Sequence, residues 1–159
     1  MTETVNVLIV GVGGQGVLKA SQVLSEVLVR QGFDVKQSEV HGMSQRGGSV
    51  VSEVRYGSEV HSPLTPYRAA DYIVALDANE AQRAEPRLRH SGGRMIEISE
   101  ELADQIEHPR SHNMAALGRL SALLDIPPSV WHEAIRRCLP AGTIETNIAA
   151  FEAGRRFDN

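Results

Sequence analysis

Two glycine-rich segments carry most of the groups that could bind a ligand. The first, GVGGQG at residues 11–16, follows an apolar run at 7–10 and precedes an amphipathic stretch. This order of strand, glycine turn and helix is the context that the dinucleotide fingerprint G-x-G-x-x-G requires. Glycines let the backbone approach an anionic group closely, and a helix start offers free N–H groups. The candidate residues of this turn are Gly11, Gly13, Gly14, Gln15 and Gly16.

The second segment, SEVHGMSQRGGSV at residues 38–50, places polar side chains after a second predicted strand. Ligands of open α/β sheets bind at the carboxyl ends of strands. Arg46 offers a planar fork for a carboxylate or phosphate, and His41 offers a candidate acid–base group. The alternative is an ion pair between Arg46 and Glu39 that only ties down the loop. The candidate residues here are Glu39, His41, Ser44, Gln45, Arg46, Gly47 and Gly48.

A nicotinamide or flavin cofactor at the glycine turn is one alternative, and a purely structural turn is another. A dinucleotide site needs an acidic residue about 20 positions after the turn, at the carboxyl end of the second strand. Asp34 lies 18 residues after Gly16 but begins the predicted strand, whereas Glu39 lies 23 residues after it. Because neither carboxylate has the expected spacing, we expect weak NAD binding or none.

Other chemistries find little support in the sequence, so we assign no catalytic residue and no metal site. The segment from Gly42 to Arg46 lacks the closing glycine of the serine hydrolase elbow G-x-S-x-G. His108 and His112 have the spacing of two ligands on one helical turn, but Pro109 lies between them. Iron–sulfur clusters need several thiolates, and Cys138 is the single cysteine. This chain is therefore expected to hold no such cluster by itself.

Length and composition indicate one domain spanning residues 1–159. The net charge of −4 and an aromatic content of 4% argue against a nucleic-acid-binding face. We find no apolar stretch long enough to cross a membrane and no signal peptide at the amino terminus. A single cysteine fits a reducing compartment, so we expect a cytoplasmic protein.

Apolar periodicity and turn residues predict the elements that position the two segments. Strands are expected at 4–10, 33–39, 49–56, 72–76 and 94–98, with a further short strand after a hairpin turn at Gly57 and Ser58. Helices are expected at 14–30, from Asp77 or Asn79 to His90, from Ser99 to before Pro109, and at 112–124, 129–139 and 143–155, the last capped by Thr143. The order predicts an α/β fold: a three-layer domain with a mostly parallel, Rossmann-like sheet and a helical C-terminal portion.

The two glycine-rich segments, in this order and at this spacing, resemble the gamma subunit or gamma domain of 2-oxoacid:ferredoxin oxidoreductases. Within that family they are most similar to the beta subunit of indolepyruvate ferredoxin oxidoreductases, with its GVGGQG turn and SEVHGMxQRGGSV segment. Further matches cover nearly the whole chain: SPL at 62–64, AD at 70–71, GG at 92–93, HNMAALG at 112–118 and ETNIAAFEAG at 145–154. The stretch 98–112 is short for this family, in which a strand and a loop commonly lie there.

The resemblance implies oxidative decarboxylation of a 2-oxoacid, such as indolepyruvate or another aryl pyruvate, to an acyl-CoA, with electrons passed to ferredoxin. Thiamine diphosphate, Mg and iron–sulfur clusters would lie in partner chains, and coenzyme A would be a co-substrate. This chain would complete the hetero-oligomeric complex through its last helix and be inactive alone. Self-association as a homodimer remains open for the free chain. The alternative functions are a stand-alone nucleotide-binding module, an NAD-linked oxidoreductase and a scaffold without activity.

Overall fold

A five-stranded sheet forms the centre of the molecule, and its strand order is β2-β3-β1-β4-β5. The computed structural model describes residues 3–42 and 47–157. The strands are β1 (Val5–Val12), β2 (Asp34–His41), β3 (Ser49–Gly57), β4 (Tyr72–Ala75) and β5 (Arg94–Ile96). β3 pairs antiparallel with both β1 and β2, whereas β4 pairs parallel with β1 and β5. Four strands therefore run in one direction, as predicted, and β3 is reversed.

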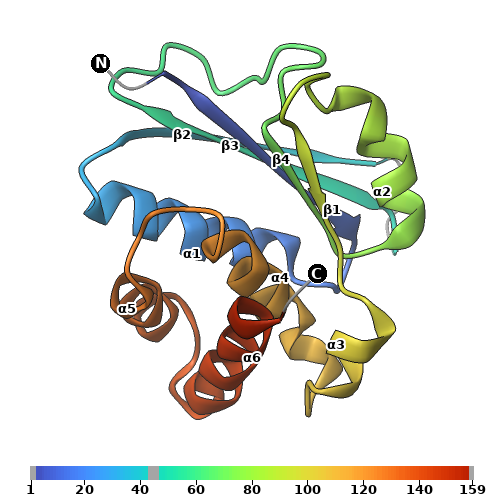
Figure 1. The fold of residues 1–159 in the computed structure, drawn as a ribbon, viewed down its shortest axis with the longest axis vertical. Helices are drawn as coiled ribbons and strands as arrows, with labels where there is room; N and C mark the ends of the chain where they lie inside the picture. Colours follow the sequence, from blue (N-terminus) through green and yellow to red (C-terminus); the bar gives the residue numbers. More distant parts are fainter. Residues whose placement is uncertain (1–2, 43–46, 158–159) are drawn as a thin grey trace.

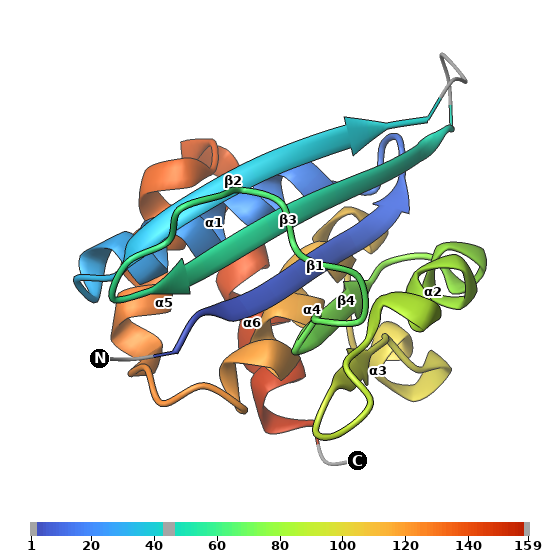
Figure 2. The same cartoon turned by 90° about the horizontal axis from the view of Figure 1, so that it is seen from above.

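Helices cover the two faces of the sheet unequally (Figures 1 and 2). One face carries the four long helices, and the other carries one short helix together with the loop at 58–71. The helices are α1 (Val17–Arg30), α2 (Ala78–Ala84), α3 (Glu100–Asp104), α4 (His112–Ser121), α5 (Pro128–Cys138) and α6 (Ile144–Arg156). The predicted three-layer α/β domain with a helical C-terminal portion is confirmed. None of these helices is both long and apolar enough to cross a bilayer.

The helix after the glycine turn forms because its apolar residues share one face. Val17, Ala20, Leu24 and Val27 recur at helical spacing and are all buried against the sheet. Gly32 follows the helix with φ +86°, a left-handed conformation that favours glycine and ends the helix. The predicted face and stop are both confirmed.

Several predicted helix ends differ from the structure. The third and fourth helices end at Asp104 and Ser121, short of the ends predicted before Pro109 and at residue 124. Asp77 caps α2 by accepting hydrogen bonds from the backbone N–H groups of Asn79 and Glu80, as predicted. The helix stops at Ala84 and a 3₁₀ turn at Glu85–Arg87 follows, because Pro86 has no N–H to donate. The predicted continuation to His90 is therefore wrong. Thr143 stands at the N-cap position of α6, as predicted, but makes no side-chain capping hydrogen bond, since its hydroxyl donates to the carbonyl of Pro140 at 2.8 Å.

The predicted short strand after Gly57 and Ser58 is also wrong. Residues 58–71 form a loop across the outer face of the sheet. Side chains satisfy the middle of its backbone: Val60 N donates to Asp34 at 2.7 Å and Thr65 N donates to Glu53 at 2.6 Å. At its end, Asp71 N donates to the carbonyl of Asn6 in β1 at 2.9 Å. Arg55 donates to the carbonyl of Ser62 at 2.7 Å. The loop thus takes the place of a covering helix over part of this face.

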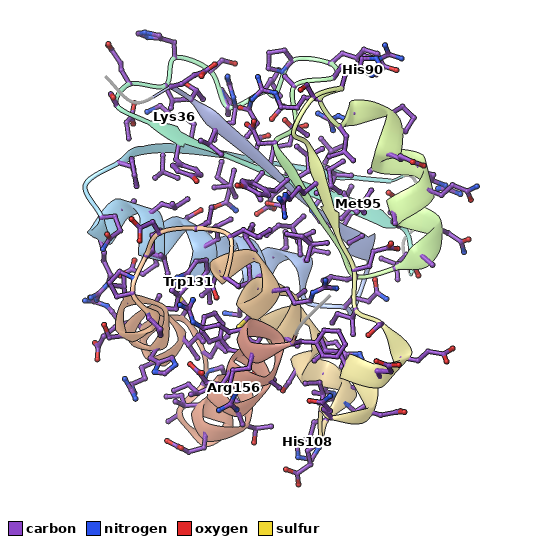
Figure 3. All side chains as sticks on the ribbon, viewed as in Figure 1. Lys36, His90, Met95, His108, Trp131 and Arg156 are labelled. Carbon is purple, nitrogen blue, oxygen red and sulfur yellow. The ribbon has the colours of Figure 1, made fainter. Side chains whose placement is uncertain are left out.

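The C-terminal helices pack at backbone distance. A Cβ atom on Gly118 of α4 would collide with the carbonyl oxygen of Phe151, and one on Gly154 of α6 would collide with that of Ala115. The Phe151 ring lies 5.5 Å from the ring of Trp131, which is fully buried in the helical layer (Figure 3). Glycine is therefore required where α4 crosses α6.

Substitution of Gly154 by alanine should destabilise the fold, because the added methyl group must push two helices apart. We expect Gly154→Ala to lower the free energy of unfolding by about 3 kcal/mol. The matched control is Gly142→Ala, since Gly142 has no atom within 4 Å of its would-be Cβ. Chemical denaturation of both variants measures the difference, and equal stabilities would contradict the close packing.

Glu53 lies almost fully buried under the 58–71 loop and should make stability depend on pH. Burial raises the pKa of Glu53, but the hydrogen bonds from Thr65 N and from Arg87, at 2.6 Å each, outweigh burial, so the pKa lies below its usual value. A lowered folded-state pKa contributes stability above the unfolded-state pKa, and this contribution is lost as pH falls through the folded-state value.

Glu53→Gln should therefore destabilise the chain at neutral pH, and the difference from the wild type should shrink between about pH 6 and about pH 3. Denaturation at a series of pH values measures this change. Glu85→Gln, at an exposed position, is the control and should leave the pH profile unchanged. A constant difference between Glu53→Gln and the wild type over this range would refute the assignment.

Candidate functional site

The two glycine-rich segments meet at the carboxyl edge of the sheet. Gly13 N donates to the carbonyl of Gly48 at 3.0 Å, which joins the β1–α1 turn to the segment between β2 and β3. Gly42 N donates to the carbonyl of Ser49 at 2.6 Å and closes the base of this hairpin. The end of β2, the start of β3 and the end of β1 lie at the same end of the sheet (Figure 2). The structure thus brings the two predicted segments together.

Gln15 points back into the turn. Its Oε1 accepts from Val12 N at 2.8 Å, and its Nε2 donates to the carbonyl of Leu76 at 3.1 Å. A Cβ on residue 11 would lie 2.8 Å from that Oε1, so Gly11 leaves the space that the amide fills. Both ends of the Gln15 amide therefore have internal partners, and the side chain braces β1 against β4.

Asn113 is a residue of this site that sequence reasoning missed. It lies near the start of α4, is only 6% exposed, and donates from Nδ2 to the carbonyl of Gly16 at 3.1 Å. Gly16 precedes α1 with φ +81°, and a Cβ there would collide with the Asn113 amide. The only signal in the sequence was the segment HNMAALG, which matched the family but indicated no role. Gly14, in contrast, has φ +92° and open space around its would-be Cβ.

Two open grooves flank the base of the hairpin. The groove on the α1 side has a volume of about 360 Å³ and is lined by the glycine turn together with Leu18, Lys19 and His41. The groove on the α2 side has a volume of about 420 Å³. Its lining combines glycines of the hairpin with polar residues of α2: Gly42, Gly47, Gly48, Ser49, Asp77, Asn79, Glu80 and Arg83.

The remaining candidates of the second segment divide into two groups. Glu39 and His41 are exposed near the end of β2, with His41 Nε2 3.7 Å from a carboxylate oxygen of Glu39. Ser44, Gln45 and Arg46 lie outside the described residues. The roles predicted for these three residues, and the alternative ion pair between Arg46 and Glu39, therefore stay predictions.

The strand order does not suit a dinucleotide. In a dinucleotide-binding fold the second strand lies beside the first, and its terminal carboxylate reaches the ribose. Here β3 lies between β1 and β2, so Glu39 stands two strand spacings, roughly 10 Å, from β1. Asp34 is at the opposite end of β2, where it binds Lys36 and Val60 N, each at 2.7 Å. Neither carboxylate is placed to hold a ribose at the glycine turn.

Metal ligands and reactive thiols do not gather at this edge. Within residues 3–42 and 47–157, no group of three or more His, Cys, Asp or Glu side chains is placed to hold a metal ion. His108 lies at the periphery of the helical layer (Figure 3). Burial raises the pKa of the Cys138 thiol, which favours the protonated, less nucleophilic form.

Known proteins resemble this chain over almost its full length. The family model described as pyruvate ferredoxin/flavodoxin oxidoreductase matches residues 6–97 and 84–157. The indolepyruvate oxidoreductase subunit IorB of Methanothermobacter thermautotrophicus is 30% identical, covering 94% of this chain and 95% of the relative. The IorB subunit of Thermococcus kodakarensis is 31% identical, covering 94% and 93%. These alignments span 187 and 188 positions, more than the 159 residues here, so the relatives carry segments that this chain lacks.

Solved structures share the fold. The gamma subunit of a keto/oxoacid ferredoxin oxidoreductase from Geobacter sulfurreducens has a TM-score of 0.75 at 20% identity, covering 94% of this chain and 95% of that one. A 2-oxoglutarate:ferredoxin oxidoreductase from Magnetococcus marinus has a TM-score of 0.80 at 19% identity, and the match covers 98% of this chain but 31% of the longer chain. On the family match and the identity over nearly the whole length, this chain belongs to the pyruvate ferredoxin/flavodoxin oxidoreductase family.

Proposed function

We propose that this chain is a subunit of a thiamine diphosphate-dependent 2-oxoacid:ferredoxin oxidoreductase. The observation that carries the proposal is the full-length similarity to proteins named as subunits of indolepyruvate oxidoreductase and 2-oxoglutarate synthase. Identities of 29–31% to the former and 26–27% to the latter favour an aryl pyruvate such as indolepyruvate as the substrate. The complex would convert the 2-oxoacid and coenzyme A to an acyl-CoA and carbon dioxide and pass two electrons to ferredoxin.

The residues of this chain do not fit an iron–sulfur cluster, because Cys138 is the single cysteine and such clusters need several thiolates. We assign the clusters, thiamine diphosphate and its Mg ion to partner chains. In this arrangement the chain supplies a surface, not a redox centre. It completes the active site when the partner is bound and is inactive alone.

The carboxyl edge of the sheet is the part of this chain that we assign to the shared active site. Gly14 is exposed in the turn with open space around it, and His41 lines the groove between the hairpin and α1. The contact between Gly13 and Gly48 makes the turn and the hairpin one surface. Arg46 lies between Gly42 and Gly47 in the sequence, and we propose that it holds an anionic group: a substrate carboxylate, a cofactor diphosphate or a partner carboxylate.

Reconstitution tests the proposed function directly. The chain should co-purify with a larger thiamine-binding subunit, and the reconstituted complex should reduce ferredoxin when an aryl pyruvate and coenzyme A are supplied. Omission of this chain should abolish that reduction, because the shared site is then incomplete. Full activity without the chain would contradict the proposal. Micromolar NAD binding in a calorimetric titration of the free chain would favour the NAD-linked alternative instead.

Arg46→Lys tests the proposed anion site. Lysine keeps the charge but not the planar fork, so loss of a bidentate contact should cost about 2 kcal/mol in the reconstituted complex, or roughly thirtyfold in kcat/KM. Thermal stability of the free chain should barely change. Arg30→Lys, at an exposed position in the last turn of α1, is the matched control. A variant that loses stability but keeps its activity per folded molecule would show that Arg46 is a structural ion-pair partner.

A further inference from the structure

Large apolar side chains are exposed on the face of the sheet that the four long helices do not cover. Val40, Leu64 and Tyr67 are 55%, 61% and 69% exposed. Val40 pairs with Val51, which packs in the same cluster as α2, so the side chains of this pair lie on the outer face. Leu64 and Tyr67 belong to the loop at 58–71, which crosses the same face (Figure 2). Apolar surface that gathers in this way marks a binding surface.

Hydrogen bonds from the sheet hold the loop in place while its apolar side chains stay exposed. The hydroxyl of Ser38, on the same face of β2 as Val40, donates to the carbonyl of Pro63 at 3.3 Å. Thr65 is buried, and its N–H donates to Glu53 of β3 at 2.6 Å. The residues around these two anchors form one apolar band. This band consists of Val40, Val51, Pro63, Leu64, Pro66 and Tyr67.

Arg68, at the end of the apolar band, is held in an unfavourable backbone conformation. Its φ of +60° lies in the left-handed region, which residues with a side chain rarely adopt. Ala69 N donates to the carbonyl of Pro66 at 3.2 Å and closes the turn. The guanidinium lies 5.7 Å from the centre of the Tyr67 ring and donates to Nε2 of His90 at 2.8 Å. The turn therefore presents Tyr67 and Arg68 as a preformed pair, and strain of this kind is typical of functional positions.

The charge of Arg68 indicates what kind of partner fits this surface. Within residues 3–42 and 47–157, its two contacts are with the rings of Tyr67 and His90, and neither ring supplies a negative charge. The carboxylates beneath the loop are already paired within the chain: Asp34 with Lys36, Glu53 with Arg87 and Asp71 with Arg89. A second copy that used the same face would bring none of these carboxylates free to Arg68. The surface therefore fits a different protein that carries a carboxylate beside apolar side chains.

We propose that the apolar band and Arg68 form the docking surface for the thiamine-binding partner subunit. The partner places apolar side chains on the band and a carboxylate against the Arg68 guanidinium. Val40 directly precedes His41, which lines the groove beside the glycine turn. A partner that lies on the band therefore also reaches the edge of the sheet that we assign to the shared active site. This inference rests on the proposed function of the chain as a subunit of a larger complex.

The affinity of the chain for the purified partner subunit, measured by calorimetric titration, tests the apolar band. Leu64→Ser and Tyr67→Ser should each raise Kd by about tenfold or more, because each removes an apolar contact from the interface. The unfolding midpoint of the free chain should stay close to that of the wild type, since both side chains are exposed. Val29→Ser is the matched control: it removes a 57% exposed apolar side chain from α1, and Kd should stay within about twofold.

Arg68→Gly separates binding from folding. Glycine adopts a φ of +60° without strain, so chemical denaturation should find the variant at least as stable as the wild type. Loss of the charge should raise Kd by about tenfold at low salt and make Kd less dependent on salt concentration. Arg30→Ala, which removes an exposed charge at the end of α1, should change neither quantity. Lower stability of Arg68→Gly with an unchanged Kd would show that Arg68 serves the fold and not the partner.

The outcomes distinguish the docking surface from the proposed function. If the wild-type chain does not bind the partner subunit and ferredoxin is reduced without it, the proposed function fails and this inference fails with it. If the wild type binds and is required, but Leu64→Ser, Tyr67→Ser and Arg68→Gly bind equally well, only the docking surface is wrong. Sedimentation of the free chain tests the other occupant: a dimer that Tyr67→Ser dissociates would assign this face to a second copy and overturn the proposal.

Discussion

The amide of Gln15 joins the ends of two neighbouring strands, and the geometry of the whole carboxyl edge depends on it. The amide accepts from β1 at Val12 and donates to the carbonyl of Leu76 after β4. Only glycine at residue 11 leaves room for this arrangement. The same turn then passes through the left-handed Gly16 into α1, where Asn113 anchors it to α4. The six residues of the turn, 11–16, thereby determine how β1, β4, α1 and α4 meet.

The reversed strand β3 decides what this edge can present. Because β3 lies between β1 and β2, the base of the hairpin stands directly beside the glycine turn, while the carboxylates of β2 are displaced from it. The glycine motif of dinucleotide-binding folds thus occurs here with a different strand order, in which a second glycine-rich segment takes the position of the ribose-binding carboxylate. The motif itself is the same in the two folds, and the strand beside it determines which groups face a ligand.

Predictions from sequence succeeded where the determining interactions are local. The apolar face of α1 and the Asp77 cap depend on residues within one or two helical turns. The strand expected after Gly57 failed because Asp34 and Glu53 accept from Val60 N and Thr65 N, which lie 26 and 12 residues away from them, beyond the reach of local spacing rules. At the site, the sequence identified the two segments as candidates, but it predicted neither the hydrogen bond that joins them nor the inward role of Gln15.

The hydrogen bond from Gln15 to the carbonyl of Leu76 joins residues that are 61 positions apart, and the hydrogen bond between Ser49 and Glu80 joins residues 31 positions apart. Neither contact has a signature in local spacing.

The position of β2 at the edge of the sheet, by contrast, can be recognised in the residues of β2 itself. This strand pairs on one side only, yet Asp34, Lys36 and Glu39 place charges along its eight residues. Charged side chains on an open edge discourage pairing with strands of other molecules. The charges along β2 therefore disfavour edge-to-edge pairing between copies of this chain.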